Sequence, residues 1–302
     1  MDIRELEYFR VVCDLKSITK AAHSLYMSQQ GLSKVIRNIE KELGTSLLVR
    51  KASGIELTRT GAYLYSNLPS LLREYEDICS NIAYIERSEN HEIELLSSYG
   101  IIRLVTPECL EAFRKKYPGI HLIVHEYPDR EAERRWEQGQ GSVAFLVGNN
   151  DVTFPDAVQM ESFSVKLLVN RRHPLAGKKE VSFADLKGER FYLENTEFNI
   201  HQLITGRCRA AGFEPEIVFG TSGFSLCHKM VQQNKGISVT VDFIFDDMTG
   251  SELVMIPFAG EDLYWSTWMQ TRADKIPNED VRLFGEHVMR WMEDIRSGAF
   301  QR

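Results

Sequence analysis

The sequence has few cysteines and no long hydrophobic run. Its 302 residues include five cysteines, which have neither metal-ligand spacing nor the density of a disulfide-stabilised domain. No stretch of 18 apolar residues is present, and the first residues are typical of a helix start, not of a signal peptide. We therefore expect a reduced, cytoplasmic protein of two or three domains. A redox pair of Cys208 and Cys227 is the alternative, although buried free cysteines are commonplace.

The motifs of common enzyme classes are also missing. Residues 220–224 lack the final glycine of a nucleophile elbow, and neither a phosphate loop nor a dinucleotide glycine pattern occurs. His121 and His125 have metal-pair spacing only on a helix, and on the strand predicted there they lie about 13 Å apart. We predict no catalytic residue, no metal and no cofactor. A small-molecule carrier is another class, but it would account only for the second half of the chain.

The acidic residues are unevenly distributed. The chain carries 43 acidic and 36 basic residues, a net charge of −7, whereas the first 60 residues have a small basic excess. DNA repels a uniformly acidic protein, but it need not repel an N-terminal domain that carries local basic groups. We call this N-terminal domain the head. Because this excess is modest, DNA binding would require several heads in a dimer or tetramer.

Residues 17–61 have the pattern of two short helices followed by a hairpin. Ser17 is a suitable N-cap for the first helix, in which Ala21 and Ala22 permit a close helix crossing. Ser28 is a suitable N-cap for a second helix that ends before Gly44. Two apolar runs around a Ser-Gly turn then predict a hairpin. The arrangement is that of a winged helix-turn-helix.

The outer face of the second helix is polar. Glutamine and serine can read base edges, while lysine and arginine can hold phosphates, although such a face can also be merely solvated. The predicted DNA-contacting residues in the helix are Ser28, Gln29, Gln30, Ser33, Lys34 and Arg37. Arg50, Lys51 and Arg59, in and after the hairpin, are expected to contact backbone phosphates or a minor groove.

A heptad pattern follows the hairpin. Between residues 60 and 87 the sequence favours one long helix, with Pro69 expected to bend or loosen it. Apolar residues spaced alternately by three and four predict a dimerisation seam, the alternative being packing against the helix's own domain. The seam residues are Leu64, Leu68, Leu71, Tyr75, Ile78, Ile82 and Ile85.

The remaining residues alternate between strand and helix patterns. We expect strands at 92–97, 120–126, 143–147, 164–169, 190–193, 217–219 and 236–241, and helices at 106–116, 130–138, 183–186, 200–211, 224–233 and 280–297. This alternation predicts an α/β fold with largely parallel pairing.

The first 61 residues resemble the LysR-type transcriptional regulators. Two departures are Gln30, where proline is common, and Leu48, where phenylalanine is common. The residues that carry the resemblance are Leu6, Phe9, Val12, Ser17, Ala21, Ala22, Leu25, Ser28, Gln29, Ser33, Ile36, Glu40, Leu43, Gly44, Leu47, Arg50, Leu57, Thr58 and Gly61.

The second half is similar to the effector domain of the same family, which has a periplasmic-binding-protein-like fold of two subdomains. The matching pieces are Phe113, Tyr117-Pro118, Gly139, Arg172 to Leu175, Asp185 to Gly188, Gly212-Phe213 and Gly236 to Ser238. The resemblance implies a DNA-binding domain at 1–59, a linker and hinge at 60–90 and an effector domain at 91–302, with subdomain I at 92–162 and 265–302 and subdomain II at 163–264. The implied partners are double-stranded DNA, a small-molecule effector, further copies of the chain as a dimer or tetramer, and RNA polymerase, with no membrane.

Ligands of open α/β sheets bind at the carboxyl ends of strands. Gly100 replaces a hydroxyl residue common in the family, and Ser142 replaces an aspartate, so the effector is left open. Asp129 would disfavour a simple anion unless it points away. The predicted effector contacts, each of which could instead be an ordinary helix cap, are Ser98, Tyr99, Gly100, Ile101, Asp129, Gly148, Asn149, Phe198, Asn199, Thr221, Ser222, Phe224 and Thr240.

Overall fold

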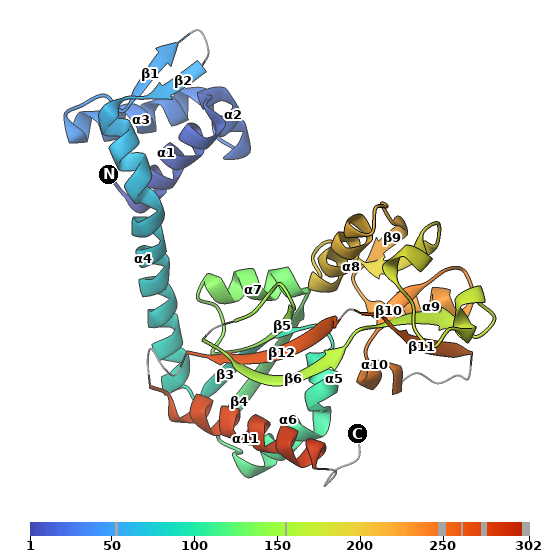
Figure 1. The fold of residues 1–302 in the computed structure, drawn as a ribbon. Coiled ribbons are helices and arrows are strands. Elements are labelled where there is room, and N and C mark those ends of the chain that lie inside the picture. Colours follow the sequence, from blue (N-terminus) through green and yellow to red (C-terminus); the bar gives the residue numbers. More distant parts are fainter. Residues whose placement is uncertain (52–53, 155, 247–251, 261, 273–276, 298–302) are drawn as a thin grey trace. The chain divides into compact units, whose positions relative to one another are not determined.

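The computed structural model describes the chain except for residues 52–53, 155, 247–251, 261, 273–276 and 298–302. It divides into two compact units, Met1–Ser80 and Asn81–Arg302, each of which is described by itself (Figure 1).

The first unit is a winged helix-turn-helix, as the sequence predicts. Ser17 caps α2 by accepting a hydrogen bond from the N–H of Lys20, and Ala21 and Ala22 are buried where α2 meets its neighbours. Leu32, at 0% exposed, lies in the same core. The elements are α1 (Ile3–Leu15), α2 (Ile18–Ser24), α3 (Gln29–Leu43), β1 (Leu48–Lys51), β2 (Gly54–Leu57) and the first part of α4 (Arg59–Glu89).

The second unit has two lobes. The first lobe is a five-stranded sheet in the order β4-β3-β5-β12-β6, where β4 and β5 run parallel to β3 and β12 runs antiparallel to both of its neighbours. Its elements are β3 (Glu92–Ser98), α5 (Ile101–Val105), α6 (Pro107–Lys116), β4 (His121–Tyr127), α7 (Asp129–Glu137), β5 (Val143–Asn149), β6 (Val158–Ser164), β12 (Tyr264–Thr271) and α11 (Glu279–Arg296).

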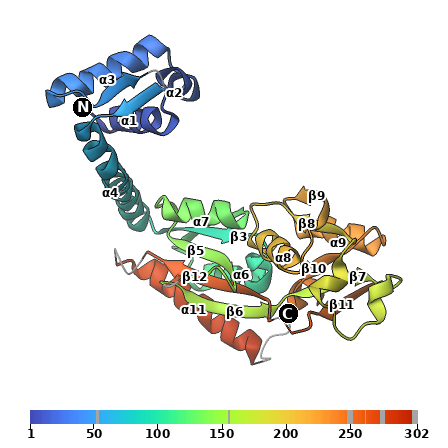
Figure 2. The same cartoon turned by 45° about the horizontal axis from the view of Figure 1, so that its top comes forward.

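Helices cover both faces of this sheet (Figure 2). Because strand side chains alternate between faces, Leu96 and Leu146 pack in a cluster with Trp136 of α7, while Phe145 packs with Phe284 of α11 on the opposite face. Burial on both faces explains why β5 reads as a continuous apolar run.

The second lobe contains a three-stranded antiparallel sheet in the order β10-β7-β11 and a parallel pair, β8 and β9. Its helices α8 and α9 follow β8 and β9 along the chain. The elements are β7 (Lys166–Asn170), the short 3-10 helices η1 (Pro174–Gly177) and η2 (Phe183–Leu186), β8 (Arg190–Glu194), α8 (Asn199–Ala210), β9 (Glu216–Thr221), α9 (Phe224–Gln232), β10 (Ser238–Thr240), α10 (Asp242–Asp246) and β11 (Leu253–Pro257).

Two chain segments connect the lobes, and they lie side by side. The first runs from β6 to β7 through Val165, and the second returns to β12 through Leu263. The N–H of Val165 donates to the Leu263 carbonyl at 2.8 Å. A paired double crossover of this kind is suited to act as a hinge between lobes.

The expectation of largely parallel pairing is wrong. The parallel pairs are β3 with β4, β3 with β5, and β8 with β9, whereas β12 and β7 pair antiparallel with all their neighbours. Those two strands begin where the chain crosses between lobes, which reverses their direction. The strand expected at 164–169 corresponds to β7, which begins two residues later, whereas the preceding strand β6 was not predicted.

Candidate functional site

Helix α3 is held at both ends and along one face. The hydroxyl of Ser28 accepts the N–H of Gly31 at 3.0 Å, and Gly44 ends the helix in the left-handed conformation. Leu32, Ile36 and Ile39 fix its inner face in the core of the first unit. The register of the helix is therefore set by apolar burial, and its outer face is presented in a defined orientation.

The outer face of α3 is polar and open to solvent. Ser28, Gln29 and Gln30 are exposed in the first turn, whereas Ser33 is half-buried. Lys34 and Arg37 are exposed farther along the same helix. Gln29, Gln30, Ser33 and Lys34 thus lie in the first two turns of α3, the part that enters a major groove in helix-turn-helix proteins, and Arg37 lies in the third turn.

The wing is fixed to α3 by Glu40. Its Oε1 accepts the N–H groups of Leu47 at 2.8 Å and Leu48 at 3.2 Å, just as β1 begins. Glu40 appeared in the sequence only as a family position, because nothing in the local pattern shows which distant N–H groups it reaches. The side chains of Arg50 and Lys51 lie outside the described part of the structure, and Arg59 is exposed at the start of α4.

The predicted seam on α4 divides into two parts. Leu68 is fully buried and Leu64 half-buried, and both pack against the core of the first unit. From Leu71 onward the five remaining seam residues face solvent, whereas Leu72 and Tyr84 of the same helix are buried. The exposed fractions of the five seam residues are 46% for Leu71, 46% for Tyr75, 50% for Ile78, 61% for Ile82 and 45% for Ile85.

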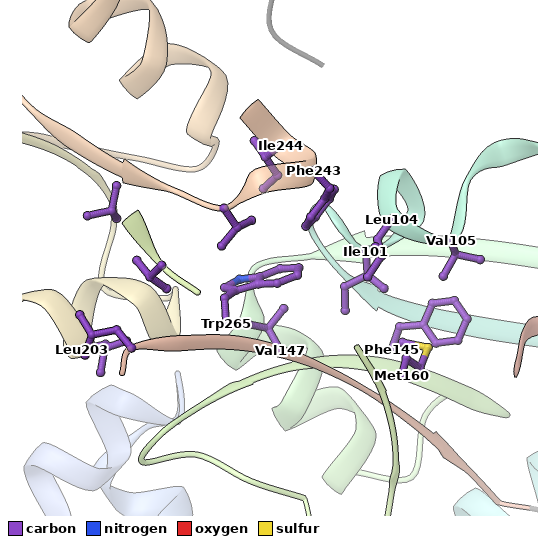
Figure 3. Close-up of a cluster of buried hydrophobic side chains, with 14 of the residues drawn as sticks. Ile101, Leu104, Val105, Phe145, Val147, Met160, Leu203, Phe243, Ile244 and Trp265 are labelled. Carbon is purple, nitrogen blue, oxygen red and sulfur yellow. The ribbon is translucent and has the colours of Figure 1, made fainter. Parts of the chain in front are cut away.

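A cavity of about 840 Å³ lies between the two lobes of the second unit. Phe243, Ile244 and Trp265 line it and belong to the same buried cluster as Val147 and Leu203 (Figure 3). Six of the predicted effector residues also line it: Tyr99, Gly100, Asp129, Phe198, Ser222 and Phe224.

The other predicted effector residues occupy different places. Thr240 lines a smaller hollow of about 40 Å³, which shares Glu194 and Phe224 with the large cavity. Ser98 and Ile101 are fully buried in the first lobe. Seven predicted effector residues are not part of the described lining of the large cavity: Ser98, Ile101, Gly148, Asn149, Asn199, Thr221 and Thr240.

Asn199 joins the lobes instead of lining the cavity. Its side-chain amide donates to the carbonyl of Val147 at 2.8 Å and to Oε1 of Glu133 at 2.8 Å, and both of these residues belong to the first lobe. Its carbonyl accepts from Nδ2 of Asn149 at 3.4 Å. At 3% exposed, Asn199 is a buried tether whose hydrogen-bonding groups are used within the protein.

Several residues that line the cavity escaped the sequence analysis. Arg103 lies one turn beyond the first strand end, and Glu126 and Glu194 belong to the strands themselves. Phe243 and Trp265 come from α10 and β12, whose positions the sequence did not predict. A search at strand ends could find Glu126 and Glu194, but no local signal marks the other three.

The cavity contains carboxyl groups with raised pKa values. Burial raises the pKa of Asp129 to about 8 and that of Glu194 to about 7. Burial also raises the pKa of Glu126, an effect opposed by a hydrogen bond from the Gly100 backbone and by Arg103. Desolvation lowers the pKa of His228 to about 4, so this imidazole is neutral at physiological pH.

The two cysteines considered as a redox pair are free and buried. Cys208 and Cys227 are fully buried, and burial raises the pKa of each thiol to about 12. Among the described residues, no group of three His, Cys, Asp or Glu side chains could hold a metal ion. None of the described helices has the length and apolarity needed to cross a membrane.

Comparisons with known proteins agree with both units. The model of the bacterial regulatory helix-turn-helix proteins of the lysR family matches residues 3–62, and that of the LysR substrate binding domain matches residues 86–293. YwbI of Bacillus subtilis (strain 168), an uncharacterized HTH-type transcriptional regulator, is 30% identical over 303 residues, with 99% of each chain covered. The HTH-type transcriptional regulator CysL of the same organism is 27% identical over 78% of each chain.

Solved structures share the fold. Full-length BenM superposes with a TM-score of 0.55 at 21% identity, covering 100% of this chain and 99% of BenM. Full-length CbnR, in complex with its target DNA, superposes with a TM-score of 0.50 at 20% identity, covering 97% of this chain and all of CbnR.

A winged helix-turn-helix and a two-lobed domain around a cavity define a ligand-responsive DNA-binding protein. The chain belongs to the LysR family. It is a DNA-binding transcriptional regulator with an effector-binding domain, and not an enzyme.

Proposed function

We propose that α3 enters the major groove of an operator, with Gln29, Gln30 and Ser33 reading base edges and Lys34 and Arg37 holding phosphates. The observation that carries this is the polar outer face of α3, capped by Ser28 and held by a buried inner face. Short amides and hydroxyls reach base edges, while basic side chains reach the backbone. Arg50, Lys51 and Arg59 are assigned to phosphates beside the same groove.

Binding selection from random duplexes, at fixed salt, tests this assignment. Gln29→Ala and Ser33→Ala should each change the preferred base at one position, at a cost of about 1–3 kcal/mol for the original site. Arg59→Ala should weaken all sites alike and reduce the salt slope by about one. Arg73→Ala, an exposed basic residue on α4, is the control. If affinity and base preference survive in the Gln29 and Ser33 variants, α3 is not the reading helix.

We also propose that α4 forms the dimer seam, with the head at 1–59, the linker at 60–90 and the effector domain at 91–302. Leu71, Tyr75, Ile78, Ile82 and Ile85 are exposed apolar residues at coiled-coil spacing. A surface stripe of this kind is costly unless a second helix covers it. A second copy would also supply the second head that a two-fold operator needs.

Leu71→Glu should convert the dimer or tetramer into smaller species, measured by size exclusion with light scattering. Tyr63→Glu places the same charge on an exposed aromatic residue of α4 outside the seam, and it should leave the mass unchanged. An unchanged mass for Leu71→Glu would locate the interface elsewhere. The folded content of both variants is checked by circular dichroism.

We propose that an effector closes the two lobes about Val165 and Leu263 and changes the spacing of the DNA-binding heads. The cavity between the lobes and the paired crossover strands support this mechanism. A footprint on the DNA beside its own gene, with and without metabolite extract, measures it. A ligand that binds but leaves the footprint unaltered would contradict it.

We propose that the protein acts in the cytoplasm. We also propose that RNA polymerase responds to the change in the spacing of the DNA-binding heads. Transcription in vitro from a footprinted promoter, with and without the regulator, measures that step. An output that is unchanged when the regulator occupies its site would contradict the proposal.

A further inference from the structure

Acidic residues dominate the charged lining of the cavity. Five carboxyl groups line it, from Glu108, Glu126, Asp129, Glu194 and Asp246. Arg103 is the one basic residue in the described lining, and its guanidinium lies over the ring of Phe224, 5.3 Å from the centroid. Because its pKa is about 8, Asp129 is largely protonated at neutral pH, and a negatively charged ligand would meet repulsion from those of the other four carboxyl groups that are ionised.

Two of the backbone positions that could receive an anion are occupied by the protein's own carboxyl groups. The N–H of Asn199, at the start of α8, donates to Oδ2 of Asp129 at 2.9 Å. The backbone of Gly100, before α5, is hydrogen-bonded to Glu126. Free N–H groups at helix starts attract carboxylates, but at these two positions that attraction is already used inside the molecule.

Hydrogen-bond acceptors remain available deeper in the cavity. Glu194 lines both the large cavity and the adjoining hollow, and no cation contacts its carboxyl group in the described part of the chain. His228 lines the same hollow and is only 5% exposed. The ring of His228 forms a hydrogen bond with the Val239 backbone, whereas its Nε2 has no hydrogen-bond partner among the described residues. Because this imidazole is neutral, we assign Nε2 as an acceptor.

Aromatic rings surround these acceptors. Tyr99 of the first lobe stacks on Phe198 of the second, with ring centroids 6.2 Å apart, and Phe224 and Trp265 line both the cavity and the hollow. Aromatic faces attract cations and also bury apolar groups. A ligand that suits this lining combines a positive charge carrying N–H donors with an apolar or aromatic body.

We propose that the effector is a small organic cation, with its ammonium group at Glu194 and Nε2 of His228 and its apolar body against Phe198, Phe224 and Trp265. This inference rests on the cavity being the effector site. The ammonium group could belong to a simple amine or to a zwitterion such as an amino acid, whose carboxylate would lie near Arg103 and the uncapped start of α9.

Calorimetric titration of the full chain with three related probes tests the proposal. Phenethylamine carries only the ammonium, phenylalanine carries both charges, and hydrocinnamate carries only the carboxylate. We expect phenethylamine or phenylalanine to bind and hydrocinnamate to fail. Tighter binding of phenylalanine would identify a zwitterion as the source of the ammonium, and tighter binding of phenethylamine would identify an amine. Preferential binding of hydrocinnamate, or no binding of either ammonium probe at millimolar concentration, would overturn the proposal.

A matched pair of variants locates the ammonium group. Glu194→Gln should lower the affinity for phenethylamine at least about tenfold. Glu111 is an exposed carboxylate on α6, and Glu111→Gln should leave that affinity unchanged. If Glu194→Gln binds as tightly as the wild type, the ammonium is not at Glu194 and the proposal fails.

The pH dependence of the wild-type chain gives a test that requires no variant. A bound cation favours ionised Glu194, so affinity for phenethylamine should rise between pH 6 and 8. Glu194 interacts with Asp129 on α7 and Cys227 on α9, and the ring of His201 on α8 hydrogen-bonds to its backbone carbonyl at 2.7 Å. Arg103 on α5 and His228 on α9 line the same cavity or its adjoining hollow. Affinity that is flat or falls over this interval would overturn the assignment.

The role of the cavity as the effector site and the cationic nature of the ligand can fail separately. If hydrocinnamate binds and changes the footprint, the cavity remains the effector site and only the cationic class is wrong. If phenethylamine binds in a Glu194-dependent way but leaves the footprint unchanged, the ligand class stands and the effector-driven closure fails.

Discussion

The backbone N–H of Asn199 donates to Oδ2 of Asp129 at 2.9 Å, joining the start of α8 in one lobe to the start of α7 in the other. The side-chain amide of Asn199 adds two bonds to the first lobe, to Val147 and Glu133. One buried residue thus fixes the two lobes at a single point beside the cavity.

Removing the Asn199 side chain should loosen this connection. Asn199→Ala deletes both amide donors and leaves the carbonyl of Val147 buried without its partner, at a cost of about 1–3 kcal/mol in stability. Urea unfolding measures the change through the midpoint. Gln202→Ala, an exposed residue on the same helix, should shift the midpoint little. Equal midpoints for the two variants would show that Asn199 is not a tether.

Asp129 should make the stability of the second unit depend on pH. Folding raises the pKa of this carboxyl from its ordinary value of 3.8 to about 8, so the folded state holds the proton more tightly. The contribution of Asp129 to stability is therefore full below about pH 4 and is lost as the pH rises towards 8. Asp129→Asn keeps an oxygen acceptor for Asn199 but cannot ionise. Its melting temperature relative to wild type should rise from pH 5 to pH 8, and a constant difference would contradict the assignment.

Gly61 should tolerate no larger residue. A Cβ at this position would lie 2.0 Å from the carbonyl oxygen of Leu47, which also accepts the N–H of Thr58. Gly61→Ala should destabilise the first unit by about 1–3 kcal/mol because backbone must move. The matched change Gly206→Ala, in open space on α8, should stabilise the second unit by about 0.4–1 kcal/mol. Differential scanning calorimetry measures both, and a neutral Gly61→Ala would contradict the close approach.

Cys208 and Cys227 should be chemically inert in the folded protein. Both thiols are buried and their pKa values are raised to about 12, so little reactive thiolate forms near neutral pH. Labelling followed by mass spectrometry should modify them only after unfolding in urea. Rapid modification of the native chain, or a disulfide between them after peroxide treatment, would revive the redox interpretation.

The head could be predicted almost completely from local pattern. Ser17, Ser28 and Gly44 end or begin helices through contacts within a few residues, and the burial of Leu32 and Ile36 follows from helical spacing. These features depend on periodicity and capping, which a sequence displays directly. Glu40 is the exception, because its partners on the wing are set by the packing of the hairpin against α3.

The cavity could be predicted only in outline. Tyr99, Gly100, Phe198 and Phe224 were found because strand ends in α/β folds face ligands. Trp265 was missed because its strand enters the first lobe from the far end of the chain, through an antiparallel pairing that local pattern does not show.

The sequence by itself determined the winged head, the long heptad-bearing helix and the α/β character of the effector domain, since each rests on short-range periodicity. Only the tertiary structure decided that Leu68 is buried while Leu71 is exposed, that Asn199 ties the lobes together, and that carboxyl groups outnumber Arg103 in the cavity. Those facts depend on which distant segments meet. Long-range packing sets burial and charge environment, and neither can be read from neighbouring residues along the chain.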